Sequence, residues 1–291
     1  MTPADEWTVL RLLKWSEDYL ARKGVESPRL DVELLLAEAL GMKRLELYVR
    51  FEHVPAPAER ERFKRLLLRR AAREPAAYIL GRREFYGISF EVGPGVLVPR
   101  PETEHLVDAA VEALKGLERP LAADVGTGCG NVAVALASAL PAAVVYAVER
   151  SPAALRYAAR NVEAAGLKGR VRLLEGDLLA PLPRELLGSL DAVVSNPPYV
   201  PEGDEGSLPP EVLAEPREAL FAGRDGLDMV RRLVREARPW LKDGGLLAFE
   251  VGAGQAPAAA ELLRKNGFSG VVARRDYAGI ERILSARKDD G

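Results

Sequence analysis

The sequence predicts an α/β protein in which a mostly parallel sheet, with helices on both faces, follows a smaller helical domain. From about residue 103 onward, short β-branched segments alternate with longer helical segments, a pattern that specifies parallel strands joined by helices. Residues 1–78 show only the helical spacing of apolar residues. With 291 residues, the chain is long enough for two domains that each bury a core.

The first domain is expected to span residues 1–78 and to contain helices only. Helix-start signals occur at Thr2-Pro3 and again at Ser27-Pro28, because an N-cap residue is followed in each case by proline at the first helical position. A third helical segment covers residues 44–50 and a fourth follows Pro57. This domain is therefore expected to be a small helical bundle.

The fourth helical segment carries a dense run of arginines from Arg60 to Arg73. Residues 1–80 have a net charge of +2, whereas the rest of the chain has a net charge of −4. The run could contact an acidic partner. The interleaved Glu59 and Glu61 favour a solvated helix face instead.

Glycine and proline residues mark residues 79–98 as the junction between the domains, where two short β-like pieces at 85–87 and 88–92 predict a hairpin. The second domain is expected to span residues 99–291. Its expected helices are residues 104–115, 131–140, 152–165, 227–240 and 256–266, and its expected strands are residues 121–125, 144–148, 171–174, 192–195, 246–251, 269–273 and 280–285.

Composition excludes several classes of protein. A single cysteine rules out an internal disulfide framework and a Cys-rich zinc site, and neither His53 nor His105 has a partner at metal-ligand spacing. No apolar run approaches the roughly 20 residues of a membrane span, and the N-terminus begins with acids rather than a signal peptide, so a cytoplasmic protein without a metal is expected. A formal charge of −2 disfavours a nucleic-acid backbone as the main partner.

A glycine loop, Asp124-Val-Gly-Thr-Gly-Cys-Gly130, stands between an expected strand and an expected helix, where its backbone can approach a ligand closely. Glu149 ends the next strand, where an acid can accept hydrogen bonds from both ribose hydroxyls. No lysine follows the loop, which disfavours ATP, and Asp124 would repel a pyrophosphate. Acids at the ends of both strands suit a cationic nucleoside such as S-adenosyl-L-methionine. An ordinary strand-to-helix turn would not explain the matched acid at Glu149.

Asp177 follows the third strand, in Leu174-Glu-Gly-Asp177. A carboxylate at this position could accept a hydrogen bond from the exocyclic amine of an adenine. It could also be an acid of a surface loop, and the sequence leaves both interpretations open.

Asn196-Pro197-Pro198-Tyr199 ends the fourth strand, at the edge where doubly wound sheets bind their ligands. The two prolines remove two N–H donors and stiffen the backbone, so the preceding carbonyls stay available as acceptors. Together with the Asn196 oxygen and the Tyr199 ring, they are suited to hold a planar –NH2 group. Because the nitrogen of such a group is delocalised and a poor nucleophile, holding its hydrogens favours a lone pair aimed at a methyl group.

With these motifs, the chain resembles the HemK/PrmC family of protein-(glutamine-N5) methyltransferases over nearly its full length. The shared segments are Leu30-Asp-Val-Glu-Leu-Leu-Leu36, Glu84-Phe-Tyr-Gly87, Val98-Pro-Arg-Pro-Glu-Thr-Glu104, the loop 124–130, Asp191-Ala-Val-Val-Ser-Asn-Pro-Pro-Tyr199, Glu215-Pro216, Ala219-Leu220, Gly223-Arg-Asp-Gly-Leu-Asp228 and Glu250-Val-Gly-Ala-Gly-Gln255. The resemblance implies a Rossmann-like class I S-adenosylmethionine-dependent methyltransferase domain, with a mixed, mostly parallel seven-stranded sheet, behind an N-terminal helical substrate-recognition domain and a β-hairpin linker.

The family methylates the glutamine of the Gly-Gly-Gln loop in class I peptide-chain release factors, leaving S-adenosyl-L-homocysteine as the product of the cofactor. The resemblance implies the following cofactor-binding residues: Gly126, Thr127, Gly128, Cys129, Gly130, Glu149, Asp177, Leu178 and Asn196. It implies the following substrate-binding residues: Asn196, Pro197, Pro198, Tyr199, Phe85 and Arg100, of which Asn196, Pro197 and Tyr199 would be catalytic.

Four positions need comment when the family's residue roles are applied to this sequence. Many relatives have aspartate in place of Glu149, and some have an aromatic residue in place of Leu178, so stacking on the adenine would be weaker here. Cys129 fills a small-residue position of the loop and is interpreted as a packing residue rather than a nucleophile. Gln255 is interpreted as a loop or helix-start residue.

Two other functions remain open at this point. A DNA or RNA adenine-N6 methyltransferase would use the same Asn-Pro-Pro-Tyr geometry on an adenine amine, but it should show a basic face and flip its target base. A catalytically inactive module could use the helical domain as a protein adaptor. The net charge of −4 outside residues 1–80 disfavours the first, and the intact glycine loop and Asn196 disfavour the second.

Overall fold

The computed structural model describes residues 6–290, which form two compact units. The first unit is Met1–Gly81 together with Pro209–Ala214, and the second is Arg82–Leu208 together with Glu215–Gly291. The hairpin between the predicted domains thus belongs to the second unit. Among the described residues, no helix combines the length and the apolar character that crossing a membrane requires.

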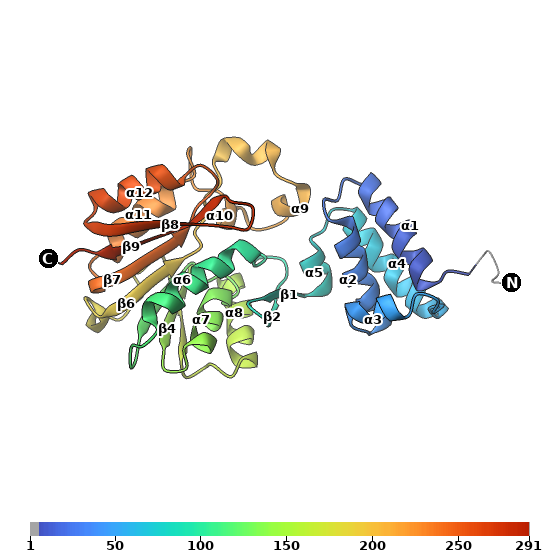
Figure 1. Ribbon diagram of the computed structural model, residues 1–291, viewed down its shortest axis with the longest axis horizontal. Coiled ribbons are helices and arrows are strands. Elements are labelled where there is room, and N and C mark those ends of the chain that lie inside the picture. Colours follow the sequence, from blue (N-terminus) through green and yellow to red (C-terminus); the bar gives the residue numbers. More distant parts are fainter. Residues whose placement is uncertain (1–5, 291) are drawn as a thin grey trace. The chain divides into compact units, whose positions relative to one another are not determined.

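The first unit contains helices only (Figure 1). Its helices are α1 (Val9–Arg22), α2 (Pro28–Leu40), α3 (Arg44–Val49), α4 (Pro57–Ala71), α5 (Ala76–Leu80) and the short α9 (Pro210–Leu213). The start signal at Thr2-Pro3 lies outside the described residues, and α1 begins at Val9, where the Thr8 hydroxyl oxygen accepts a hydrogen bond from the Arg11 N–H. The apolar faces of these helices bury Leu35, Leu47 and Phe63 in one core.

The arginine run of α4 is divided between the surface and the interior. Arg70 is 4% exposed, and its guanidinium donates to Asp31 of α2 at 2.6 Å and to Glu211 of α9 at 2.8 Å. Arg73 also pairs with Glu211, whereas Arg69 stays exposed and pairs with Glu74. Successive residues of a helix point in directions about 100° apart, so a run of arginines cannot all face solvent. The predicted solvated helix face therefore describes only part of the run.

The second unit is built on a seven-stranded mixed sheet, as the predicted fold class requires. Its strands are β3 (Leu121–Val125), β4 (Val144–Glu149), β5 (Val171–Glu175), β6 (Leu190–Ser195), β7 (Leu241–Glu250), β8 (Phe268–Arg275) and β9 (Glu281–Lys288). Their order is β5-β4-β3-β6-β7-β9-β8, in which β3 to β7 are parallel and the pairs β7–β9 and β9–β8 are antiparallel.

Helices cover both faces of this sheet (Figure 1). One face carries α6 (Glu104–Leu114), α7 (Asn131–Ala139) and α8 (Pro152–Ala164), and the other carries α11 (Asp228–Ala237) and α12 (Ala256–Lys265). In the second unit, four short elements have no counterpart among the predicted ones: η1 (Pro101–Thr103), η2 (Arg184–Leu186), η3 (Glu202–Ser207) and α10 (Arg217–Leu220). Each is shorter than the two helical turns over which periodicity becomes readable.

The strand order reverses between β3 and β6. From β3 the chain proceeds outward to β4 and β5, and β6 then returns to pair with the other edge of β3. The loops that follow these two central strands therefore diverge and leave a crevice at their carboxyl ends, the usual ligand position in an open α/β sheet. The glycine loop follows β3, and Asn196 follows β6.

A hairpin is present, formed by β1 (Arg82–Phe85) and β2 (Ile88–Glu91) paired antiparallel. Its first strand ends where the predicted piece 85–87 begins, because residues 86 and 87 form the turn. Tyr86 and Gly87 have φ values of 52° and 70°, as the right-handed twist of a two-residue hairpin turn requires. The Tyr86 N–H donates to the Glu104 carboxylate at 2.7 Å, which attaches the turn to the start of α6.

Candidate active site

The glycine loop after β3 is held by a buried carboxylate. Asp124 is 1% exposed, and one of its oxygens accepts from the Thr127 hydroxyl at 2.5 Å and from the Ala133 N–H at 3.0 Å. These bonds join the end of β3, the loop and the first turn of α7. Asp124 therefore organises the loop from within.

The pH dependence of stability should report on Asp124. Burial raises the pKa of this carboxyl from 3.8 to about 7, so the folded protein holds a proton that the unfolded chain has lost between these two values. We therefore expect this contribution to the free energy of unfolding to fall as pH rises from about 4 to about 7, and to level off above that. Urea denaturation at several pH values should show this slope in the wild type and lose it in Asp124→Asn. An equal slope in both proteins would contradict the assignment.

Glu149 closes the other side of the glycine loop from the end of β4. One of its carboxylate oxygens accepts from the Gly128 N–H at 3.0 Å, and the other accepts from the Ser151 N–H at 2.9 Å. A carboxylate offers about four acceptor positions, so both oxygens keep capacity for further donors. The arrangement leaves Glu149 able to accept two ribose hydroxyls.

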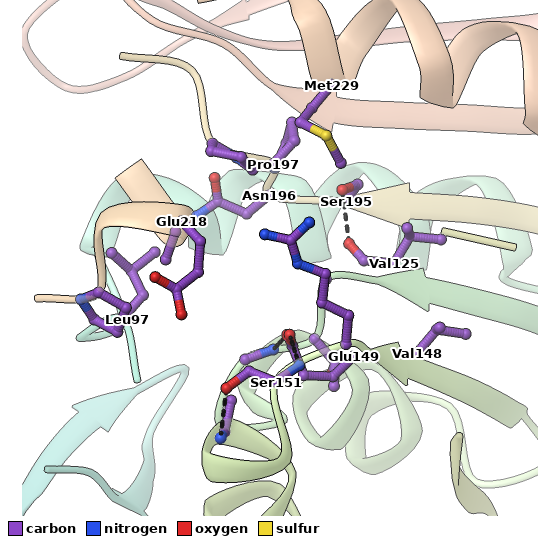
Figure 2. A pocket seen from close by; sticks show the side chains of 18 of the residues that line it. Leu97, Val125, Val148, Glu149, Ser151, Ser195, Asn196, Pro197, Glu218 and Met229 are labelled. Carbon is purple, nitrogen blue, oxygen red and sulfur yellow. Dashed lines mark hydrogen bonds between the residues drawn. The ribbon is translucent and has the colours of Figure 1, made fainter. Parts of the chain in front are cut away.

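A pocket of the second unit brings together most of the predicted ligand-binding residues (Figure 2). Those that line it are Gly126, Thr127, Gly128, Glu149, Asp177, Leu178, Asn196, Pro197 and Pro198. Figure 2 shows Asn196 and Pro197 on one side of the pocket and Glu149 and Ser151 on the opposite side. The pocket lies at the carboxyl ends of β3, β4 and β6, where the strand order reverses.

Two loop residues of the predicted cofactor set lie outside the pocket lining. Cys129 is 1% exposed, and burial raises the pKa of its thiol to about 12, which agrees with its interpretation as a packing residue. Gly130 has a φ of 85° and begins α7 against the backbone of Ala158, where a Cβ would come within 3.4 Å. Direct contact of these two residues with a cofactor stays a prediction.

Three residues of the predicted substrate set also lie outside the lining. Phe85 is 2% exposed and packs edge-on against Phe90 inside the hairpin. Arg100 donates to the buried Glu215 at 2.5 Å, and the other oxygen of Glu215 accepts from the Val98 N–H at 2.9 Å. These bonds tie the segment before η1 to the segment before α10. They position pocket-lining loops, and contact of Phe85 or Arg100 with a substrate stays a prediction.

Tyr199 is the third of these residues. Its hydroxyl donates to Glu250 of β7 at 3.1 Å, and its carbonyl oxygen accepts from the Gln255 side chain at 2.8 Å. Gln255 also accepts from the Gly252 N–H at 2.7 Å, so it braces two loops besides beginning α12. The expected packing of the Tyr199 ring on a substrate stays a prediction.

The structure adds pocket-lining residues that sequence reasoning did not select. Among them are Leu97, Arg150, Glu218, Phe221 and Met229. They come from a loop after the hairpin, from the turn after β4 and from the chain around α10 and α11. The resemblance covered parts of these segments, but no local pattern indicates which of their side chains face a pocket.

The remaining acid of the predicted set, Asp177, lines the pocket and is half exposed at its side chain. The Arg232 guanidinium of α11 donates to it at 2.6 Å. The second oxygen of Asp177 lies 3.4 Å from the same guanidinium. Asp177 therefore lines the pocket as the partner of Arg232 and is not an isolated surface acid.

Asn196 stands at the carboxyl end of β6, next to the end of β3. The Ser195 hydroxyl before it donates to the Val125 carbonyl at 2.7 Å, which joins the two strand ends (Figure 2). The Asn196 Nδ2 donates to the Thr103 hydroxyl oxygen at 3.1 Å. Its Oδ1 is buried and accepts no hydrogen bond from the described residues, the one such side-chain atom among the residues that line the pocket. Because an unpaired buried acceptor costs free energy, this oxygen is suited to receive a donor from a ligand.

With its mixed seven-stranded sheet, its pocket at the strand ends and its match to a methyltransferase domain model, the protein is a class I methyltransferase. The PrmC N-terminal domain matches residues 11–81, and the methyltransferase small domain matches residues 104–224. A release factor glutamine methyltransferase of Rhodopirellula baltica is 44% identical over 97% of both chains, and one of Moorella thermoacetica is 46% identical over 93% of this chain and 95% of its own. The chain belongs to the release factor glutamine methyltransferase family, which confirms the predicted resemblance.

A solved methyltransferase structure from Pyrococcus furiosus is similar in fold, with a TM-score of 0.51. It is 23% identical, and the match covers 79% of this chain and 99% of that one. The similarity bears on the fold alone and agrees with the sheet described above.

Proposed function

We propose that this protein transfers a methyl group from S-adenosyl-L-methionine to the side-chain nitrogen of the glutamine in the Gly-Gly-Gln loop of class I peptide-chain release factors. The observation that carries the proposal is Asn196 Oδ1, a buried acceptor without a partner in a pocket that also contains the glycine loop and Glu149. Family membership supplies the class of substrate. A cytoplasmic location, where release factors act, is part of the same proposal.

The residues of the pocket fit the cofactor. Glu149 has acceptor capacity for the ribose hydroxyls, and Gly126 and Gly128 present backbone without side chains toward the methionine part. Asp177 and Leu178 would flank the adenine, with Met229 as a further apolar wall. When bound, S-adenosyl-L-methionine supplies a methyl group whose bond to sulfur breaks with its electron pair remaining on sulfur, which leaves S-adenosyl-L-homocysteine.

The residues after β6 would prepare the glutamine nitrogen. Asn196 Oδ1 would accept one N–H of the amide, and a backbone carbonyl next to Pro197 would accept the other. With both hydrogens held, the nitrogen lone pair is freed from conjugation and directed along the line of transfer, so the site favours the transition state over the planar ground state. The nitrogen becomes cationic as its new bond to carbon forms, and one proton then leaves to solvent, so no strong base is required.

Nucleic acid is not a substrate in this proposal, and the helical first unit would recognise the release factor. The test is incubation with methyl-labelled S-adenosyl-L-methionine and a class I release factor, beside a release factor whose Gly-Gly-Gln glutamine is replaced by asparagine. We expect label on the unaltered factor only.

Three results would contradict the proposal. Label on DNA or RNA would support adenine methylation instead. Label on the asparagine variant of the release factor would place the acceptor elsewhere in that protein. Tight binding of the release factor without any transfer would indicate a binding module.

A further inference from the structure

A chain of three hydrogen bonds, one buried and two partly buried, leads away from the pocket residue Asn196. It joins Asn196 after β6 to Thr103 at the end of η1, then to Glu250 at the end of β7, and finally to Tyr199. Thr103 and Glu250 are each 1% exposed. Neither residue lines the pocket, and both belong to sequence motifs for which the proposed chemistry assigns no role.

Thr103 is the last residue of η1, directly before α6, and has helical backbone angles, with φ of −67° and ψ of −17°. A threonine caps a helix from an extended backbone conformation, so its hydroxyl is not used as a cap here and makes no bond to the first turn of α6. Its hydroxyl instead donates to Glu250 at 2.6 Å and accepts from Asn196 at 3.1 Å. The Thr103 hydroxyl is therefore committed to the segment that carries Asn196 rather than to its own helix.

In the structure, the Thr103 hydroxyl donates to one oxygen of Glu250 and the Tyr199 hydroxyl lies against the other. Burial raises the pKa of Glu250, and a proton held on the oxygen that faces Tyr199 leaves the other oxygen an acceptor for Thr103. A hydroxyl has one proton, so the Thr103 oxygen has only lone pairs left for Asn196. Asn196 must then turn its Nδ2 toward Thr103, because the opposite orientation would set two acceptors against each other.

We propose that Thr103 and Glu250 are positioning residues that fix the carboxamide of Asn196 with its oxygen, rather than its nitrogen, available to the substrate amide. The inference rests on the proposed function of the pocket and deepens it. An Asn196 turned by 180° would present N–H groups to the N–H groups of glutamine and would repel them. The fixed orientation thus accounts for selection of a substrate –NH2 group over a carbonyl or carboxylate oxygen.

The kinetic test uses Thr103→Val, which keeps the shape of the side chain but removes the hydroxyl, with Thr103→Ser as the matched control. We expect kcat on a class I release factor to fall by about 10²-fold in Thr103→Val, as for a misplaced catalytic group. Affinity for S-adenosyl-L-methionine and KM for the release factor should stay near their wild-type values. Thr103→Ser should recover most of the lost kcat, since it restores the hydroxyl.

Glu250→Gln provides a second test, because glutamine has nearly the shape of glutamate. Its NH2 group can donate to the Thr103 oxygen, which would release the constraint on the orientation of Asn196. Both changes act through Asn196, so the double variant should lose little more kcat than the more damaging single variant. Fully multiplicative losses would indicate two independent structural defects and overturn the proposal.

The composition of the chain permits a direct readout that does not depend on activity. The sequence has only four asparagines and one glutamine, so five side-chain NH2 groups appear in a nitrogen–proton NMR spectrum. The Asn196 signal, identified by its disappearance in Asn196→Ala, should exchange slowly with water in the wild type and in Thr103→Ser. In Thr103→Val it should shift and exchange rapidly.

An Asn196 signal unchanged by Thr103→Val would overturn the inference, and so would an equal loss of kcat in the valine and serine variants. If the wild type fails to methylate a release factor, the proposed function fails, while the NMR comparison still decides whether Thr103 orients Asn196. The two proposals can therefore fail separately.

Discussion

Asn196→Ala is expected to lose about 10²–10³-fold in kcat for methylation of a release factor, the usual cost of removing one preorganised group that acts on the transition state. The alanine cannot accept a hydrogen bond from the substrate amide, whereas the glycine loop and Glu149 keep their own hydrogen bonds. Binding of S-adenosyl-L-methionine, measured by calorimetry, should therefore survive.

Asn266→Ala is the matched control for this prediction. Asn266 ends α12, and its side chain donates to the Leu262 carbonyl at 2.7 Å, so the same chemical change is made outside the pocket. The control should keep a kcat close to that of the wild type. Persistent activity in Asn196→Ala would show that the substrate amide is held by other groups. Loss of cofactor binding in that variant would show that Asn196 serves the cofactor instead.

Arg70→Ala is expected to destabilise the first unit by about 3–5 kcal/mol, because removing one member of a buried ion pair leaves a charge without its partner. Arg70 is 4% exposed and donates to both Asp31 and Glu211, so its loss affects α2 and α9 together. Urea unfolding followed by tryptophan fluorescence would measure the effect. In a Trp240→Phe background, the remaining Trp7 and Trp15 report on the first unit alone.

Arg69→Ala provides the comparison within the same helix. Arg69 pairs with Glu74 at the surface, with 46% of its side chain exposed, so its replacement should cost about 0–1 kcal/mol. Equal destabilisation by the two variants would mean that burial of the Arg70 ion pairs adds nothing to the free energy of unfolding. A negligible effect of Arg70→Ala would mean that its neighbours repack around the missing charge.

Much of the fold could be predicted because the signals are local. The neighbouring strands β3 and β4 are short apolar runs, since parallel strands under two helical layers are buried on both faces. Their predicted bounds agree with the structure to within one residue. The agreement is poorer for β7, which begins at Leu241 rather than near residue 246, because residues 242–245 are polar or glycine and separate Leu241 from the apolar run.

The residues of the candidate site could be predicted where they belong to short motifs of consecutive residues. The glycine loop, Glu149 and Asn196 each stand at the end of a recognisable strand, and parallel strands bring their carboxyl ends to one edge. The roles of Thr103, Glu250 and Gln255 were not predictable in this way. Each acts through a residue more than 50 positions away in the chain, and no spacing rule relates them.

The sequence by itself determined the class of protein, the order of its elements and the residues that could hold a cofactor and an amide, because periodicity and short motifs are properties of neighbouring residues. Only the tertiary structure decided that Arg70 is interior while Arg69 is not, and that the Thr103 hydroxyl bonds to Asn196 and Glu250. Burial and the direction of a hydrogen bond depend on which groups meet across the fold, and that is settled only when distant segments pack together.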